Sequence, residues 1–385
     1  MRTILLIPDS FKGTMSSARI CTVMERALTR HLDASVRALP VADGGEGTVE
    51  AFLTAQGGRR VELKVTGPMG ETVTGFYGVL SDGTVVVEMA AAAGLPLVKA
   101  KLSPERTTTY GVGELLVAGA RASLAEGSGR LIVGLGGSAT TDMGAGAAAA
   151  AGVRFLDADG VAFQPCSGTL ARIDHIDATG LDPALRRCRI SVMCDIDNPL
   201  FGPRGAAHVF GPQKGAGPAL VEVLDQGLRQ ASAVVERDLG CVVADLPGAG
   251  AAGGMGAGMV AFFGASLLPG IDVVLDSLDF DHAVQDTDLI ITGEGRLDAQ
   301  SLAGKVVIGV ARRARTFSVP VIAVVGDIAD GIDAVYDQGV TAVYSINHQA
   351  IPLAQAKTRA EADLDSAMDN IARTLAATGW APSRV

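Results

Sequence analysis

The sequence predicts an α/β protein built as two domains, and three observations lead to this fold class. The chain has 385 residues, and domains of roughly 100–200 residues make two the natural number. Apolar residues make up 48% and charged residues 19%, so a sizeable core is available. Strand patterns alternate with helical periodicity at both ends of the chain, as in a parallel sheet covered by helices.

The N-terminal segment predicts the order strand, helix, strand, helix. An apolar run at 4–7 predicts a buried strand, Ser16 is a suitable helix N-cap, and the apolar residues that follow it recur at helical spacing. A second strand is expected at 36–41. A short helix that starts near Thr48 ends at a Gly-Gly pair, a common helix stop.

The pattern changes after this segment. Residues 61–66, 72–80 and 85–88 predict three strands joined by glycine-containing turns, which together form a hairpin meander. A meander is a poor continuation of a doubly wound sheet, so we place a domain boundary near residue 68.

The middle of the chain mixes strands and helices, and the C-terminal part returns to regular alternation. In the middle, strands are expected at 131–135 and 189–194, and helices at 145–151, 219–239 and 255–263. In the C-terminal part, strands are expected at 289–291, 320–325 and 341–346, and helices at 301–315, 332–338 and 352–376.

The two ends of the chain together predict one parallel sheet. Two N-terminal and three C-terminal strands form it most simply, with the middle of the chain inserted as a second α/β domain that has a mixed sheet. We therefore expect a discontinuous domain of residues 1–68 plus 286–385 and an inserted domain of residues 69–285. A cleft between two such domains is a natural place for a ligand.

Charge and composition exclude several function classes. The formal net charge is −10, which argues against nucleic acid because binding to a phosphate backbone needs a basic face. The five cysteines are scattered without a C-x-x-C pair, as in a reduced, cytoplasmic protein. We find no signal peptide and no run near the roughly 20 apolar residues that span a bilayer, so no membrane association is expected.

Polar and glycine-rich loops follow the predicted strands, where ligands of open α/β sheets bind. These loops are residues 8–13, 42–48, 134–142, 194–199, 210–215 and 292–298.

The loop Gly136-Gly137-Ser138 has the character of an anion site. Small residues let backbone N–H groups approach a phosphate, and a following helix adds its positive end. The plainer interpretation is a tight turn between strand and helix. No P-loop motif occurs, and two weak G-x-G-x-x-G/A matches, at 134–139 and 248–253, keep a nicotinamide-dependent oxidoreductase open as an alternative.

Acidic and basic residues also gather in these loops. Phosphoryl transfer needs Mg²⁺, cations on the phosphates and a carboxylate that accepts the proton of the attacking hydroxyl. Each carboxylate alone is more simply a turn residue or helix cap, and each lysine a solvated surface charge. The residues concerned are Asp43, Glu46, Asp195, Asn198, Glu294 and Asp298 among the oxygen donors, and Lys12, Lys214, Arg296 and Lys305 among the cations.

Taken in order, these loops resemble the bacterial glycerate kinase type-1 family, from Ile4 to about residue 370. The departure we note is Thr141-Asp142-Met143-Gly144, where the family usually has Asn-Asp-Gly-Gly, so Thr141 would offer a hydroxyl in place of an amide. The matching segments are 8–13, 40–48, 88–91, 136–140, 194–200, 210–216, 247–256 and 292–305.

The resemblance implies ATP-dependent phosphorylation of D-glycerate with Mg²⁺, to 2-phosphoglycerate rather than 3-phosphoglycerate. It also implies a flavodoxin-like domain joined to a second α/β domain, and it leaves a homo-oligomer open. A non-catalytic sensor of small acids is a further alternative, which would bind glycerate and leave ATP intact.

Residue chemistry and loop position suggest a role for each candidate. We assign Asp195, Lys12 and Asp43 to catalysis, with Asp195 as general base, and Asp195 with Asn198 to Mg²⁺. The nucleotide phosphates are assigned to Gly136, Gly137, Ser138 and Lys214. The hydroxy acid is assigned to Ser10, Lys12, Glu46, Glu294, Arg296 and Asp298.

Overall fold

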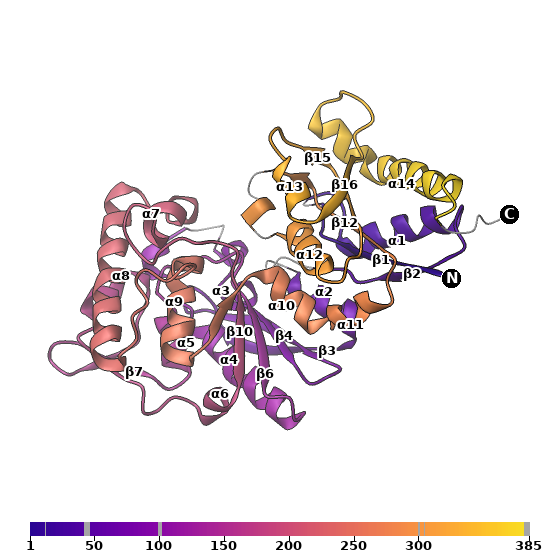
Figure 1. Cartoon of the computed structure of the whole chain (residues 1–385). Coiled ribbons are helices and arrows are strands. Elements are labelled where there is room, and N and C mark those ends of the chain that lie inside the picture. Colours follow the sequence, from indigo (N-terminus) through magenta and orange to yellow (C-terminus); the bar gives the residue numbers. More distant parts are fainter. Residues whose placement is uncertain (12, 42–46, 99–101, 299–300, 304, 381–385) are drawn as a thin grey trace. The chain divides into compact units, whose positions relative to one another are not determined.

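The structure is a computed structural model that describes residues 1–11, 13–41, 47–98, 102–298, 301–303 and 305–380 (Figure 1). It divides into two compact units. Unit 1 comprises Met1–Asp43 and Pro269–Val385, and unit 2 comprises Gly44–Leu268. The chain therefore leaves unit 1 once, builds unit 2 without interruption, and returns.

Unit 1 contains a five-stranded, fully parallel sheet in the order β16-β14-β12-β1-β2. Counted along the chain within unit 1 this is the order 2-1-3-4-5 of a flavodoxin-like doubly wound sheet, as the fold prediction requires. The strands are β1 (Arg2–Pro8), β2 (Ala34–Ala38), β12 (Leu289–Gly293), β14 (Val321–Val325) and β16 (Val340–Ser345), with a separate short pair β13 (Arg296–Leu297) and β15 (Asp327–Ile328).

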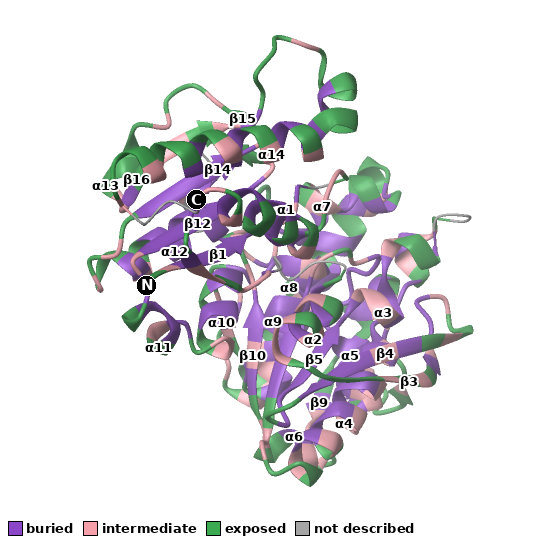
Figure 2. Ribbon diagram, turned by 90° about the vertical axis from the view of Figure 1, so that its right-hand side faces the viewer, coloured by how far each residue is buried: buried purple, intermediate pink, exposed green. Residues whose placement is uncertain are grey.

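The central strands of this sheet are mostly apolar and buried because helices cover both faces. Ile4 and Leu6 of β1 belong to a core that includes buried residues of α1 and α14, two helices that pack against each other. The central strands β12 and β14 fall in the buried class in Figure 2. The helices of unit 1 are α1 (Ser17–Thr29), α10 (Gly270–Ser277), α11 (Phe280–Gln285), η5 (Ser301–Ala303), α12 (Val306–Arg315), α13 (Ala334–Asp337) and α14 (Leu353–Ala377).

Unit 2 contains a six-stranded mixed sheet in the order β11-β10-β6-β5-β4-β3. The first four strands run parallel, and β4 and β3 continue the sheet as an antiparallel hairpin, as the meander pattern predicts. The strands are β3 (Gly58–Thr66), β4 (Thr72–Leu80), β5 (Val85–Glu88), β6 (Arg130–Gly134), β10 (Arg189–Met193) and β11 (Ser266–Leu268), beside a small sheet of β7 (Arg154–Leu156), β8 (Ala162–Phe163) and β9 (His175–Asp177).

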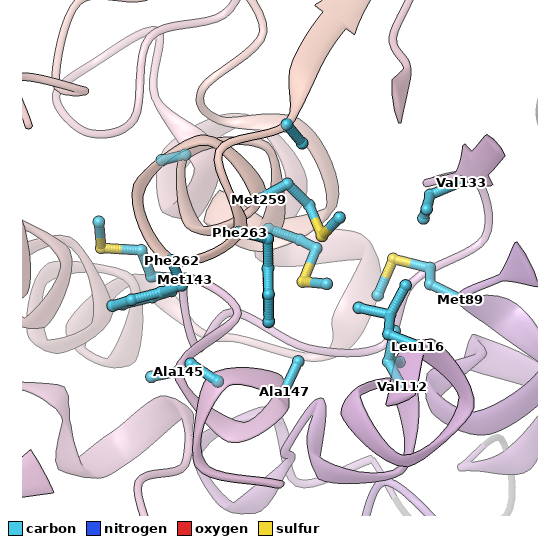
Figure 3. Packing of buried hydrophobic residues seen from close by; sticks show 14 of the residues in the cluster. Met89, Val112, Leu116, Val133, Met143, Ala145, Ala147, Met259, Phe262 and Phe263 are labelled. Carbon is cyan, nitrogen blue, oxygen red and sulfur yellow. The ribbon is translucent and has the colours of Figure 1, made fainter. Parts of the chain in front are cut away.

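Small and aliphatic side chains fill the core of unit 2, as expected for a chain with only 4% aromatic residues. Met89, Val112 and Val133 pack there, and Phe262 and Phe263 supply two of the few rings (Figure 3). The helices of unit 2 are α2 (Thr48–Gln56), α3 (Ala90–Ala93), η1 (Leu95–Leu97), η2 (Pro104–Arg106), α4 (Tyr110–Ala125), α5 (Ala145–Ala150), η3 (Ser167–Arg172), α6 (Pro183–Arg187), α7 (Ala206–Phe210), η4 (Pro212–Lys214), α8 (Pro218–Leu239) and α9 (Ala251–Phe263).

The limits of the units differ from the limits expected at residues 68 and 286. Residues 44–68 lie in unit 2 because β3 pairs with β4 along its whole length. The segment Pro269–Gln285 lies in unit 1, where Arg313 of α12 forms ion pairs with Asp276 (2.5 Å) and Asp281 (2.6 Å). The first limit is thus set by the β3–β4 hairpin, which keeps β3 in the same unit as β4, and the second by ion pairs between α10, α11 and α12.

One local expectation changes and another is confirmed. The helix expected at 301–315 is divided into η5 and α12, whereas the left-handed residues 252–254 of α9 lie before the helix expected at 255–263. Within the part of the chain that the structure describes, no helix combines the length and the apolar character needed to cross a membrane.

Candidate functional site

The polar loops of unit 1 meet at the carboxyl ends of β1 and β12. In the strand order 2-1-3-4-5 the connections diverge at this pair of strands, and such a switch point is where doubly wound sheets bind ligands. Asp9 follows β1 and Glu294 follows β12, and the backbone N–H of Asp9 donates to the carbonyl of Gly293 at 2.8 Å. The register of two parallel strands therefore brings these two carboxylates to one edge of the sheet.

Glu294 is a buried carboxylate with an unused acceptor. Its side chain is 4% exposed, and its Oε1 atom has no hydrogen-bond partner. Burial raises the pKa of Glu294 to about 7, and the nearby charges of Asp9 and Asp298 act in the same direction. The hydrogen bond from Ser301 and the charge of Lys305 lower that pKa but do not cancel the effect of burial. The group therefore changes its protonation near neutral pH.

The loop that follows Glu294 is held by reciprocal hydrogen bonds. The backbone N–H of Asp298 donates to Ser301 Oγ at 3.2 Å, and the N–H of Ser301 donates to Asp298 Oδ1 at 3.3 Å. Lys305 then forms the N-cap of α12, without a side-chain hydrogen bond to that helix. The charge of Lys305 acts on Glu294, and Lys305 lies at the N-terminus of the ten-residue helix α12, which is its positive end.

The other residues predicted in unit 1 are placed differently or fall outside the described chain. Ser10 adjoins Asp9, whose Oδ1 accepts from the Ser10 N–H at 2.6 Å. Arg296 is exposed and lies 3.7 Å from Asp327 across the β13–β15 pair, so its described ion pair is not with Glu294. Lys12, in unit 1, and Asp43 and Glu46 all lie outside the described residues.

The glycine loop of unit 2 follows β6. Gly136 and Gly137 lie in a turn, and the carbonyl of Gly137 accepts from the Leu95 N–H at 2.8 Å. Gly137 has a φ of +75°, and its side of the loop is exposed. A left-handed residue among successive N–H groups is one feature of the anion-binding concavity called a nest. The turn agrees with the plainer interpretation of this loop, and its phosphate role stays a prediction.

Lys214 reaches this loop from within the unit. Its side chain is 2% exposed, and its Nζ donates to Ser138 Oγ at 3.0 Å and to the carbonyl oxygen of Thr140 at 2.6 Å. Burial lowers the pKa of Lys214 to about 7, and the charge of Asp142 opposes that shift. Lys214 therefore holds the loop, and direct phosphate contact by its ammonium group stays a prediction.

Asp142 is the buried carboxylate that anchors the end of the loop. It is fully buried and accepts hydrogen bonds from the N–H and hydroxyl of Thr109, at 2.7 and 2.8 Å, and from the amides of Gly144 and Gly146. Burial nevertheless raises its pKa. Thr141, the departure from the family pattern, is fully buried and its Oγ1 has no hydrogen-bond partner.

Asp195 and Asn198 follow β10 on a more open loop. Asp195 is exposed, and Asn198 uses its Nδ2 to donate to the carbonyl of Arg204 at 2.8 Å. Among the residues that the structure describes, no three His, Cys, Asp or Glu side chains form a metal-binding group. Mg²⁺ commonly binds through one or two protein oxygens plus waters and substrate phosphates, so this pair still fits it.

Sequence reasoning missed three side chains near these loops. Asp9 and Ser301 act on Glu294, and Asp142 at the end of the glycine loop accepts a hydrogen bond from Thr109. Asp9 has a usable signal, a carboxylate directly after a buried strand. Asp142 lies in the loop 134–142 and at the Asp of the family pattern, but sequence reasoning gives it no role. Ser301 has no such signal, because its partners are known only once the loop is folded.

Comparisons with known proteins place the chain in a family. The sequence profile of the glycerate kinase family matches residues 4–376. A relative from Bacillus subtilis (strain 168), named glycerate kinase, is 47% identical over 378 residues, 97% of each chain. A relative from Escherichia coli (strain K12), named glycerate 2-kinase, is 44% identical over 97% of this chain and 98% of its own.

A solved structure agrees with these relatives. The crystal structure of a glycerate kinase 2 candidate from Salmonella typhimurium LT2 is 42% identical in sequence, with a TM-score of 0.86 over 98% of this chain and 99% of that chain. Both units are covered by that match. The chain therefore belongs to the glycerate kinase family, and it is an enzyme of the phosphotransferase class.

Proposed function

We propose that this enzyme transfers the γ-phosphoryl group of ATP to D-glycerate, with Mg²⁺, and that the product is 2-phosphoglycerate. The relatives' names support the substrate, and the name of the Escherichia coli relative supports the 2-position. The observation that carries the proposal is the exposed, left-handed Gly137 in the turn after β6, because a glycine turn of this kind can form a nest and an acidic protein needs such a local device to bind phosphates.

The nucleotide phosphates are assigned to this nest. The N–H groups of Gly136, Gly137 and Ser138 neutralise phosphate oxygens without adding a mobile side chain. Lys214 keeps the nest in shape through Ser138 Oγ and the carbonyl of Thr140. A fixed set of donors is what phosphoryl transfer requires, since its catalysis is mostly positioning and charge stabilisation.

The metal is assigned to Asp195 and Asn198. A carboxylate and an amide oxygen are the hard donors that Mg²⁺ prefers, and it completes its coordination with waters and phosphate oxygens. When bound, Mg²⁺ neutralises the charge that develops on the transferred phosphoryl group.

The hydroxy acid is assigned to the acidic edge of unit 1, where Ser10, Glu294 and Asp298 lie with Lys305. Lys12, Asp43, Glu46 and Arg296 keep their predicted roles as proposals. A cytoplasmic location and a homo-oligomer likewise stay predictions.

The test is a coupled ADP-release assay with Mg-ATP and D-glycerate, in which phosphorus NMR identifies the product. Glycerate-dependent ADP formation that EDTA abolishes and added Mg²⁺ restores is the expected result, with the 2-phosphate resonance. Turnover with a different hydroxy acid only would keep the kinase and discard glycerate. Glycerate binding without ATP use would favour a sensor, and NADH binding would favour the oxidoreductase.

A further inference from the structure

We propose that Glu294 is the general base of the reaction and accepts the proton of the substrate hydroxyl. This role rests on the proposed function, and it replaces Asp195 as the base. Asp195 is an exposed carboxylate that suits a metal, whereas Glu294 is shielded from water at the switch point of the parallel sheet.

The position of Glu294 is the first argument. It directly follows β12, whose end pairs with the end of β1, so backbone hydrogen bonds of two central strands fix its Cα. The carbonyl of Glu294 also accepts from the N–H of Gly326, which follows β14. A catalytic group on the end of a rigid strand is held within the small tolerances that proton transfer demands.

The unused acceptor is the second argument. Glu294 is only 4% exposed. Its carboxylate accepts a hydrogen bond from the Ser301 side chain, but its Oε1 atom has no hydrogen-bond partner. A buried acceptor without a donor is unfavourable, and an unexplained one marks a place for a ligand. A substrate hydroxyl would supply the missing donor, and the same hydrogen bond is the path of the proton.

The surrounding charges are the third argument. Among the described residues, Asp9, Asp298 and Lys305 are the ionisable groups that act on Glu294, and Ser301 is its hydrogen-bond donor. Two carboxylates and burial favour the protonated form, and Lys305 favours the ionised form, so the balance falls near neutral pH. A base is most effective when its proton affinity matches the working pH.

The groups around Glu294, at the carboxyl ends of β1 and β12, can also orient a small hydroxy acid. Lys305 and the N-terminus of α12 offer a positive site for the substrate carboxylate, and Glu294 offers an acceptor for a hydroxyl. The ligand class is therefore an α-hydroxy acid, with the carboxylate and the adjacent hydroxyl read by neighbouring groups.

The step is balanced without a further reactant. The O–H bond of the hydroxyl breaks and its oxygen bonds to the γ-phosphorus of ATP, while the bond from that phosphorus to the bridging oxygen breaks. The electron pair of that bond leaves with ADP. The proton passes to Glu294 and then to water after the product departs.

The test compares E294Q with E114Q in the full-length enzyme. Glu114 gives a matched control because it is a partly buried glutamate of unit 2 that accepts from the Thr66 N–H at 2.6 Å and has no part in the site. Steady-state rates against pH are measured with ADP release, ATP affinity with a fluorescent nucleotide, and folding by circular dichroism.

For wild type and E114Q we expect kcat/KM for glycerate to fall tenfold per pH unit below a pKa of about 7, because the base must be ionised. E294Q is expected to lose 100-fold or more in kcat, to change ATP affinity less than threefold, and to lose the acidic fall of the profile. A folded E294Q within threefold of wild-type kcat, or one that keeps the acidic fall, overturns the role of Glu294. Absence of wild-type turnover with glycerate overturns the proposed function as well, which separates the two failures.

Discussion

Two buried ionisable side chains lie at loops that follow parallel strands. Glu294 directly follows β12, and Lys214 donates hydrogen bonds to the loop after β6. Burial lowers the pKa of the lysine and raises the pKa of the glutamate, both to about 7. Such opposite shifts are typical of functional sites, because burial favours the neutral form of either group. Each of these groups also has a buried carboxylate near it, Asp142 near Lys214 and Asp9 near Glu294.

Lys214→Met tests whether the lysine holds the glycine loop. Without its ammonium group the bonds to Ser138 and Thr140 are lost, so we expect the KM for ATP to rise about tenfold, or about 1.4 kcal/mol. Hydrogen exchange of the amides at 136–140 should also become faster in the absence of any ligand. Unchanged exchange in the ligand-free variant, with weaker ATP binding, would instead indicate direct phosphate contact.

The free energy of unfolding should depend on pH through the protonation of Glu294. Because its pKa is raised from 4.5 to about 7, the folded state holds this proton more tightly than the unfolded state. The free energy of unfolding therefore falls as pH rises from about 4.5 to about 7, by roughly 3 kcal/mol from this group. E294Q removes that dependence, so its stability relative to wild type should increase between pH 5 and pH 8. A difference that stays constant across this range, in urea unfolding, would contradict the assignment.

At the scale of elements, the start of α9 shapes the glycine loop. Ala252, Gly253 and Gly254 have φ values of 54°, 71° and 89°, all left-handed, and the carbonyl of Gly253 accepts from the N–H of Met143 at 3.1 Å. A Cβ atom on Gly253 would lie 1.9 Å from the carbonyl oxygen of Thr140. The kink thus lets a helix start approach the loop backbone more closely than a side chain allows.

Gly253→Ala, compared with Gly264→Ala, separates this close approach from backbone strain. Gly264 ends α9 with a φ of 63° and has no atom within 4 Å of its added Cβ, so its substitution should cost about 1–2 kcal/mol from conformation alone. Gly253→Ala has the same strain plus the clash, so we expect at least about 2 kcal/mol more, together with weaker ATP binding. Equal losses in urea unfolding would show that the loop moves aside freely.

At the scale of the whole molecule, two sheets of different construction share one chain. Unit 2 is continuous and has its own core, whereas the sheet of unit 1 needs strands from both ends of the chain. Folding of unit 1 must therefore close a long loop, while unit 2 forms from contacts within itself.

A fragment of residues 44–268 should consequently fold alone. We expect α/β circular dichroism and one cooperative urea transition from this fragment, because its core is made of its own residues. The segments 1–43 or 269–385 expressed singly should remain unfolded, since each loses the central β1–β12 pairing and half of the core that α1 and α14 share. A fragment 44–268 without a cooperative transition would show that unit 2 depends on unit 1.

Much of the architecture follows from the sequence because local patterns determine elements. Buried apolar runs and helical periodicity predict the strands and helices of the doubly wound sheet, and the glycine-rich turns predict the β3–β4 hairpin. The loops that carry Glu294 and Gly136–Ser138 are equally visible, since glycine and charged residues follow buried strands.

The tertiary structure alone decided which of the predicted site residues are buried and which residues they contact. Lys214 meets Ser138 across 76 positions of sequence, and Arg296 meets Asp327 rather than Glu294. The unit limits likewise depend on the partners of β3 and α10. Elements form from neighbours along the chain, so sequence determined them. Burial, and with it the pKa of a charged group, depends on segments distant in sequence that only folding brings together.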